Sequence, residues 1–330
     1  MSPQTAPISL AELQRPLRSR LDRVQQELRR IVEADFGLIA EVNAHLFQMQ
    51  GKMFRPTLLL LAEEATGVAP DSRATVLGAV VELIHLATLV HDDSVDHSVL
   101  RRGMPTINSL FSHQVSVIMG DYLYSRAVIE LVRLDDLEPL RVLSRVTNEM
   151  TVGEMRQLLA YDPLEFSEEQ YDLLIRAKTA SLVSGACEIG ALRAAPEERA
   201  ALRRFGEALG MAFQIVDDLL DYTEDASVTG KPSGSDLREH KVTLPLIAAL
   251  PRLGDAERRA VGRLLHSPEP TDSQIAEIIL AVGQAGGLEY ARERAFRLAQ
   301  QAEAELDLLS ASPARDALRD SITYVIDRKR

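Results

Sequence analysis

The chain has 330 residues, of which 46% are hydrophobic and 26% are charged, and its formal net charge is −12. This composition indicates a folded protein with a substantial core and excludes an intrinsically disordered chain. The negative balance argues against nucleic acid as a partner, because proteins that bind nucleic acid present a basic face.

Apolar residues recur at helical spacing along most of the chain, and no run alternates convincingly as a half-buried strand would. Residues 1–8 are expected to be flexible, and Ser9 can cap the first helix with Glu12 at the capping-box position. The spacing predicts helices over residues 10–32, 35–49, 55–65, 72–96, 107–131, 135–159, 167–193, 196–223, 242–250, 255–266, 272–285, 287–310 and 312–328. We therefore expect an all-α protein with a single domain spanning residues 1–330, a helical bundle around a central cavity.

Cys187 is the one cysteine of the chain, so no internal disulfide can form. The N-terminus has no signal-peptide pattern. The longest apolar run is interrupted by Glu82, His85 and His91 before it reaches the length of a membrane span. We expect a cytoplasmic protein.

Two acidic motifs of the form DDxxD end apolar helices, Asp92–Asp96 and Asp217–Asp221. Positions i and i+4 share a helix face, so each motif stacks its first and last carboxylates, which repel by roughly 3 kcal/mol at ~6 Å and an effective dielectric constant of about 20. Magnesium relieves such repulsion and takes one or two carboxylates together with substrate phosphates. Acidic residues at a helix end can simply be solvated, which would explain one such motif but explains two poorly. Acid–base catalysis of glycoside hydrolysis is a weaker alternative, because it needs two carboxyl groups rather than two groups of three. The pattern predicts paired metal sites that clamp a diphosphate.

Basic residues lie close to both motifs. Lys52 and Arg55 stand at a helix start, where backbone N–H groups attract phosphate, and Arg offers a planar fork for phosphate oxygens. Each cation alone is typical of a solvated surface, but their shared placement favours phosphate binding. The full set is Lys52, Arg55, Arg101, Arg102, Lys178, Lys231 and Lys241.

In this order, the motifs resemble those of the trans-isoprenyl (polyprenyl) diphosphate synthases, long-chain type. The resemblance runs from about residue 40 to the C-terminus. It is carried by Glu82–His85, His91–Asp96, Leu100–Gly103, Gly120–Leu123, Lys178–Ala180, Phe213–Asp221, Gly230–Leu237, Lys241–Pro245 and Tyr324–Arg328. It implies the isoprenoid synthase fold and a magnesium-dependent prenyltransferase, with several Mg²⁺ ions per active site as cofactor and with isopentenyl diphosphate and an allylic diphosphate as substrates.

The resemblance also implies residue roles. Asp92 and Asp96 would bind magnesium on one wall and Asp217 on the other, with Asp221 acting through water and Asp93 and Asp218 in support. Arg101, Lys178 and Lys231 would hold the allylic diphosphate, with Lys241 beside them. Lys52, Arg55, His85 and Arg102 would hold isopentenyl diphosphate, although a base or a satisfied core histidine are alternatives for His85. Thr179 and Gln214 would lie near the reacting carbons and complete a catalytic set with Lys178, Asp92 and Asp217.

The chemistry implied is ionisation of the allylic C–O bond, attack by the isopentenyl double bond and loss of a proton, with no side-chain nucleophile. Metal and basic residues stabilise the departing diphosphate, and an apolar cavity excludes water. Three positions depart from the family's pattern: Gln50 and Met53 replace Gly and Arg, and His240 replaces Gly. We expect modest effects on affinity.

Product length is predicted from the helix before the first motif. Ala87 and Thr88, five and four residues before Asp92, are small, whereas a bulky aromatic there stops growth early in the family. The next layer, Leu83 and Ile84, is also open to a chain, and each helical turn of ~5.4 Å admits about one isoprene unit. We expect a hepta- to decaprenyl product, with a farnesyl or geranylgeranyl product as the alternative.

Three rival functions remain. A terpene cyclase on the same fold would need no isopentenyl site, which Lys52, Arg55 and the Arg101–Arg102 pair argue against. A non-catalytic subunit would be expected to lose acidic residues, and both triplets are intact. A metal-storage bundle would need Glu-x-x-His pairs that are not seen. The resemblance further implies a homodimer, and an apolar product allows peripheral membrane contact.

Overall fold

The computed structural model describes residues 8–49, 51–157, 163–223 and 234–328, and the order there is almost entirely helical. The N-terminal half contains α1 (Leu10–Gln14), η1 (Arg15–Leu17), α2 (Arg18–Ile31), α3 (Gly37–Gln48), α4 (Phe54–Ala65), α5 (Ser72–Val95), β1 (Leu100–Arg101), β2 (Met104–Pro105), α6 (Ile107–Leu110), α7 (His113–Arg133) and α8 (Leu137–Gln157). The C-terminal half contains η2 (Pro163–Glu165), α9 (Glu168–Ile175), η3 (Arg176–Ala180), α10 (Ser181–Gly190), α11 (Pro196–Thr223), α13 (Ser235–Arg238), α14 (Leu244–Ala249), η4 (Leu250–Arg252), α15 (Asp255–Leu265), α16 (Asp272–Gln284), α17 (Gly287–Leu306) and α18 (Pro313–Asp327).

The all-α prediction is confirmed, with local differences in three predicted helices. Pro16 lies in the 3₁₀ turn η1 and divides the helix expected over 10–32, because proline lacks the N–H that an α-helix needs. The helix expected over 107–131 divides at Ser112, whose extended backbone and side chain cap α7 by accepting from the Val115 N–H. The helix expected over 167–193 contains a π-helical turn, η3, a feature that often accompanies functional sites.

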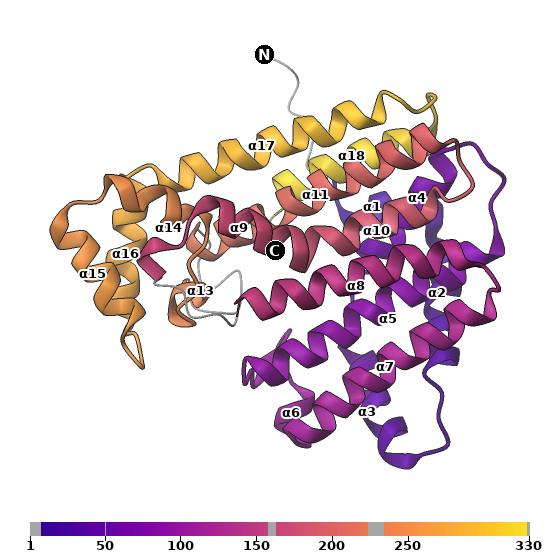
Figure 1. Ribbon diagram of the computed structural model, residues 1–330, viewed down its shortest axis with the longest axis horizontal. Helices are drawn as coiled ribbons and strands as arrows, with labels where there is room; N and C mark the ends of the chain where they lie inside the picture. Colours follow the sequence, from indigo (N-terminus) through magenta and orange to yellow (C-terminus); the bar gives the residue numbers. More distant parts are fainter. Residues whose placement is uncertain (1–7, 50, 158–162, 224–233, 329–330) are drawn as a thin grey trace.

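Helix α10 is the centre of the bundle. All ten of its residues are buried, and it packs against α4, α5, α8 and α11. Figure 1 shows α5, α8, α10 and α11 crossing the middle of the molecule, α17 and α18 covering α11, and α14, α15 and α16 gathered at one end. That end has a smaller apolar core of its own, which includes Leu246, Val261 and Val282.

Helix α5 is the one helix of the described ranges that is long and apolar enough to cross a membrane. This differs from the prediction that Glu82, His85 and His91 interrupt the apolar run before it reaches the length of a membrane span. The same helix is 67% buried inside the bundle over that stretch, and it packs against α2, α4 and α7. Its length and apolar character are therefore those of a core helix, which is buried on most of its circumference.

Glycines let α11 approach the helix beside it. A Cβ atom added at Gly210 would lie 2.6 Å from the Cα of Ala180 in η3, and one at Gly206 would lie 2.8 Å from the Cα of Ser184. Backbone atoms cannot give way as a flexible side chain can. Gly210 thus lets η3, with Lys178 and Thr179, lie close to α11, and Gly206 allows the same approach by α10.

Replacing Gly210 with alanine is expected to reduce the free energy of unfolding by about 1–3 kcal/mol, the usual cost of overpacking a core. Urea denaturation followed by circular dichroism measures this change. Gly283→Ala on α16 is the matched control, since its nearest neighbour would be Leu288 at 3.6 Å, an ordinary contact. Equal stability of the two variants would contradict the close approach of α11 and η3.

Candidate active site

The two acidic motifs face a common cleft. Asp92–Asp96 ends α5 and Asp217–Asp221 lies in the last turns of α11, although these segments are more than a hundred residues apart. Asp96 and Asp217 both line a cleft of about 760 Å³, together with residues of α8, α9, η3 and the segment 236–243. The tertiary structure therefore brings the two predicted walls together.

Lys178 is the cation of the first wall. Its Nζ lies 3.6 Å from Oδ2 of Asp92 and 2.9 Å from Oε1 of Glu154, and it donates to Oε1 of Gln157 at 3.2 Å. Burial raises the pKa of Asp92, while Lys178 opposes that rise. Glu154 and Gln157 of α8 thus hold the Lys178 ammonium close to the carboxylate of Asp92, a candidate metal ligand.

Arg101 and Asp93 form a second unit on this wall. The guanidinium Nε donates to both carboxylate oxygens of Asp93, at 2.8 and 2.9 Å, and Nη2 lies 2.8 Å from Oδ1. Arg101 sits on the short antiparallel pair β1–β2, and Asp93 is buried behind it. Asp93 therefore orients Arg101, and its predicted supporting part in metal binding stays a prediction.

The three carboxylates of the second wall have different surroundings. Asp217 lines the cleft and accepts from Nη2 of Arg328 at 2.8 Å. Asp221 is buried and accepts from the backbone N–H groups of Ser235 and Asp236, at 3.1 and 3.0 Å, so it anchors the start of α13. Its predicted part in metal binding stays a prediction.

Asp218 joins a buried chain of hydrogen bonds. Its Oδ2 accepts from the Tyr171 hydroxyl at 2.5 Å, and its Oδ1 accepts from Nε2 of Gln214 at 2.8 Å. Oε1 of Gln214 in turn accepts from the Thr179 hydroxyl at 2.8 Å. Burial, with Asp218 nearby, raises the pKa of Tyr171 well above its ordinary value, so this hydroxyl keeps its proton.

Lys241 lies at the far end of the cleft. Its Nζ is 3.7 Å from Oδ2 of Asp96 and 2.7 Å from Oε2 of Glu239. Asp236, beside it, is surrounded by other carboxylates, and burial raises its pKa to about 7. Lys231, which the sequence placed in the same loop, lies outside the residues that the structure describes.

A separate basic cluster gathers the residues predicted for isopentenyl diphosphate. Arg55 is half-buried, its Nε has no hydrogen-bond partner, and the buried carboxylate of Glu82 attracts both Arg55 and Arg102. Burial lowers the pKa of His85 well below its ordinary value, and the nearby arginines lower it further, so this imidazole is neutral. A neutral imidazole and an incompletely satisfied guanidinium suit an anionic ligand.

Gly51 brings its backbone close to Glu82 and Arg102 of this basic cluster. A Cβ atom there would lie 2.6 Å from Oε1 of Glu82 and 3.8 Å from Nη1 of Arg102. Lys52 follows on the exposed start of α4, and its carbonyl accepts from Nε2 of Gln14 at 2.8 Å. Residues from α1, α4 and α5 thus fix the backbone that presents these cations.

Two of the sequence departures stand at left-handed backbone. Met53 has φ 54° at the N-cap of α4, and His240 has φ 58° before Lys241. This conformation favours glycine, which is the family's common residue at the position of His240. A contact of 2.7 Å between Nε2 of His240 and the carbonyl oxygen of Ser267 holds it there. Gln50 lies outside the described residues.

The residues predicted to measure product length lie on α5 before the first acidic motif. Leu83, Ile84 and Ala87 are buried. Thr88 is half-buried, and its hydroxyl donates to the carbonyl of His85 at 2.8 Å. The face of α5 that the sequence selected therefore points into the bundle rather than to solvent.

The acidic residues of the cleft can hold a divalent metal ion only together with oxygens from water or a bound phosphate. No group of three His, Cys, Asp or Glu side chains in the described ranges could hold an ion by itself. Magnesium matches such a site, because it keeps several waters and binds through one or two carboxylates plus phosphate oxygens. Asp92 and Asp96 on α5 and Asp217 on α11 are the residues placed to supply these carboxylates.

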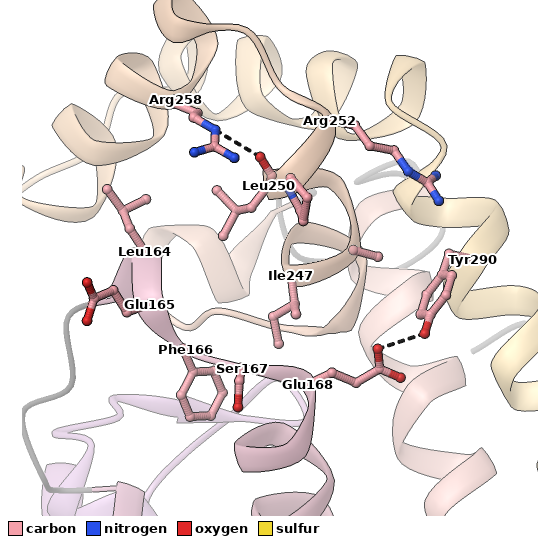
Figure 2. A pocket seen from close by; sticks show the side chains of 12 residues that line it. Leu164, Glu165, Phe166, Ser167, Glu168, Ile247, Leu250, Arg252, Arg258 and Tyr290 are labelled. Atoms are coloured by element: carbon pink, nitrogen blue, oxygen red, sulfur yellow. Dashed lines mark hydrogen bonds between the residues drawn. The ribbon is translucent and has the colours of Figure 1, made fainter.

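A second pocket, of about 560 Å³, lies between η2–α9 and α14–α15 and contains no residue of either acidic motif (Figure 2). Figure 2 shows the Tyr290 hydroxyl bonded to Glu168 at its rim, a distance of 2.7 Å. Phe166 lines both this pocket and the cleft. The chemistry predicted from the sequence therefore belongs to the cleft.

Sequence reasoning missed several residues that the structure places in the site. Glu154 and Gln157 hold Lys178, Tyr171 bonds Asp218, and Arg328 pairs with Asp217 while its guanidinium lies 3.8 Å from the Phe213 ring centre. Glu154 and Gln157 lie three apart on one face of α8, which is the signal that could have found them. Tyr171 and Arg328 meet their partners, Asp218 and Asp217, only in the folded protein.

The fold and cleft define a class: an all-α protein whose facing acidic helices and surrounding cations are suited to binding a metal ion and a diphosphate. The family model described as polyprenyl synthetase matches residues 37–282. The chain is 40% identical to an all-trans-nonaprenyl-diphosphate synthase of Rhodobacter capsulatus over 298 residues, 90% of this chain and 91% of the relative. It is 36% identical to the octaprenyl diphosphate synthase of Escherichia coli, covering 91% and 93%.

A solved structure agrees. The polyprenyl synthase of Caulobacter crescentus, described as complexed with calcium and isoprenyl diphosphate, superposes with a TM-score of 0.93 at 33% identity, covering 99% of this chain and all of that one. The chain belongs to the polyprenyl synthetase family, and it is a prenyltransferase with the isoprenoid synthase fold. The predictions of family, fold and enzyme class are confirmed.

Proposed function

We propose that this protein condenses isopentenyl diphosphate with an allylic diphosphate, in the presence of Mg²⁺, to make an all-trans hepta- to decaprenyl diphosphate. The observation that carries the proposal is the meeting of Asp92–Asp96 and Asp217 in one cleft with Lys178 and Lys241. Long-chain products of the named relatives and the small residues Ala87 and Thr88 support the product class.

Bound magnesium would screen the charge of the leaving diphosphate. Lys178, Arg101 and Lys241 are placed to bind the same oxygens, and they stabilise charge that grows as the allylic C–O bond breaks. Thr179 and Gln214 line the cleft, and we assign them a position beside the carbon that becomes positive. The released diphosphate is the acceptor for the proton lost after the new C–C bond forms.

Isopentenyl diphosphate is assigned to the cluster of Arg55, Arg102, His85 and Lys52. Glu82 lies close enough to Arg55 to offset part of its charge. A terpene cyclase needs one allylic diphosphate and no such second anion site, so this cluster favours chain elongation over the cyclase alternative.

The purified protein should be incubated with Mg²⁺, farnesyl or geranyl diphosphate and excess labelled isopentenyl diphosphate, and the dephosphorylated products sized. A ladder that ends at seven to ten isoprene units is expected. Products that stop at three or four units would replace the long-chain proposal with the shorter-chain alternative. Consumption of the allylic substrate without label would indicate a cyclase, and no turnover would indicate a subunit that needs a partner.

We further propose a homodimer formed through α7. Val117, Ile118, Ile129 and Val132 are all exposed on this helix, and Ile118 and Val132 are 66% and 64% exposed. Their spacing places them on one face, and an apolar stripe of this kind is typical of a protein interface. A second copy of the chain is the occupant proposed, because the resemblance to the polyprenyl diphosphate synthases implies a homodimer.

Ile118→Asp is expected to convert the dimer to monomer, because a charge would be buried without a partner at the interface. Sedimentation equilibrium measures the change. Leu280→Asp on α16, at a residue that is 62% exposed, is the matched control and should leave the mass unchanged. A wild-type protein that sediments as a monomer, or an Ile118→Asp variant that stays dimeric, would contradict this interface.

A cytoplasmic location is also proposed, with peripheral contact to membranes through the apolar product. Composition and the single buried thiol of Cys187 support a reducing compartment. Fractionation of cells, with and without substrate supply, tests both parts, since product-mediated contact should appear only when chains are made.

A further inference from the structure

The hydrogen-bond chain from Tyr171 to Thr179 has a defined direction. The Tyr171 hydroxyl donates to Oδ2 of Asp218, and Oδ1 of Asp218 accepts from the amide nitrogen of Gln214. The Gln214 amide has one oxygen and one nitrogen, so once its nitrogen faces Asp218 its oxygen must face Thr179. The chain crosses from α9 to α11 to η3, and all four of its residues line the cleft.

The last link decides what Thr179 presents to a substrate. A hydroxyl has one hydrogen and two lone pairs, and the hydrogen of Thr179 is given to Oε1 of Gln214 at 2.8 Å. Only lone pairs remain to face the cleft. The negative end of the hydroxyl dipole therefore points to the space where the allylic carbon becomes positive, which lowers the energy of that charge.

Tyr171 is the fixed end of this chain. Its side chain is 2% exposed and is among the largest that are fully enclosed, so its position is set by packing in α9. Asp218 is also buried. The contact at 2.5 Å holds the carboxylate plane and so aims Oδ1 at Gln214. Without it, the carboxylate and the amide beyond it could rotate.

We propose that Tyr171 is a positioning residue which, through Asp218 and Gln214, sets the direction of the Thr179 hydroxyl in the cleft. This inference rests on the proposed role of Thr179 beside the reacting carbon. Tyr171 itself touches no substrate in this account. Its effect should therefore appear in kcat, while the KM values for both diphosphates stay close to wild type.

A double-mutant cycle in the full-length enzyme tests the relay, with Tyr171→Phe, Thr179→Val and the combined variant assayed at saturating Mg²⁺. Each single change is expected to lower kcat about tenfold, the effect of losing one hydrogen bond that contributes about 1.4 kcal/mol. The double variant should be no slower than Thr179→Val alone, because the relay acts only through that hydroxyl. Tyr290→Phe, which removes a similar bond to Glu168 outside the cleft, should keep wild-type kcat.

Two outcomes would overturn the relay and can be told apart. If Thr179→Val turns over normally, the proposed role of Thr179 fails and the relay fails with it. If Thr179→Val is slow but the two losses multiply to about a hundredfold, Tyr171 acts independently and only the relay fails. Should Tyr171→Phe not fold, Tyr171→Met, which also lacks the hydroxyl and fills the site with a flexible side chain, carries the same cycle.

Discussion

Asp92→Asn is expected to lower kcat by about 10²- to 10³-fold, the range seen when one electrostatic contact to a transition state is removed. The substitution keeps the shape of the side chain and removes its charge. Asp92 is half-buried beside Lys178, which is 3.6 Å away, so the ammonium keeps its place near Glu154 but the metal loses a carboxylate ligand. Label incorporation into polyprenyl products measures the loss.

A second readout separates metal binding from general damage. Titration calorimetry with Mg²⁺ and inorganic diphosphate should show weaker joint binding by Asp92→Asn than by the wild type, with unchanged thermal unfolding in their absence. Asp307→Asn is the matched control, because Asp307 is an exposed carboxylate at the end of α17, away from the cleft. Turnover within threefold of wild type in Asp92→Asn would be incompatible with the metal role.

Ala87→Phe should shorten the product from a long chain to one of about three or four isoprene units. Ala87 lies five residues before Asp92 on α5, a rise of about 7.5 Å along the helix. That distance is between one and two extended isoprene units below the reacting diphosphate. A phenyl ring at this buried position would close the path along α5. Chromatography of dephosphorylated products measures the change.

The control for this variant addresses overpacking, which by itself costs about 1–3 kcal/mol. Ala74→Phe places the same ring at another buried position of α5, 13 residues earlier and on a different face. It should lower stability without changing the product. Unchanged product length in a folded Ala87→Phe enzyme would show that another element, rather than α5, limits the chain.

The local features could be predicted because they depend on short-range rules. Helical periodicity predicted the helices, and the i, i+4 spacing within each acidic motif predicted that its first and last carboxylates share a helix face. The errors have local causes that periodicity does not register: Pro16 tightens a turn, Ser112 starts a new helix, and the π-helical turn η3 lies inside a continuous helical pattern.

The sequence by itself determined the class of fold and which carboxylates and cations are candidates for binding metal and phosphate, because charge, side-chain chemistry and helical spacing are properties of the chain. Only the tertiary structure decided which residues meet. It placed Asp217 across the cleft from Asp96, paired Asp217 with Arg328, and turned Asp221 to the backbone of α13. It also joined Tyr171 to Thr179 through Asp218 and Gln214. Contacts between residues far apart in the sequence arise from packing of whole helices, which no short segment encodes.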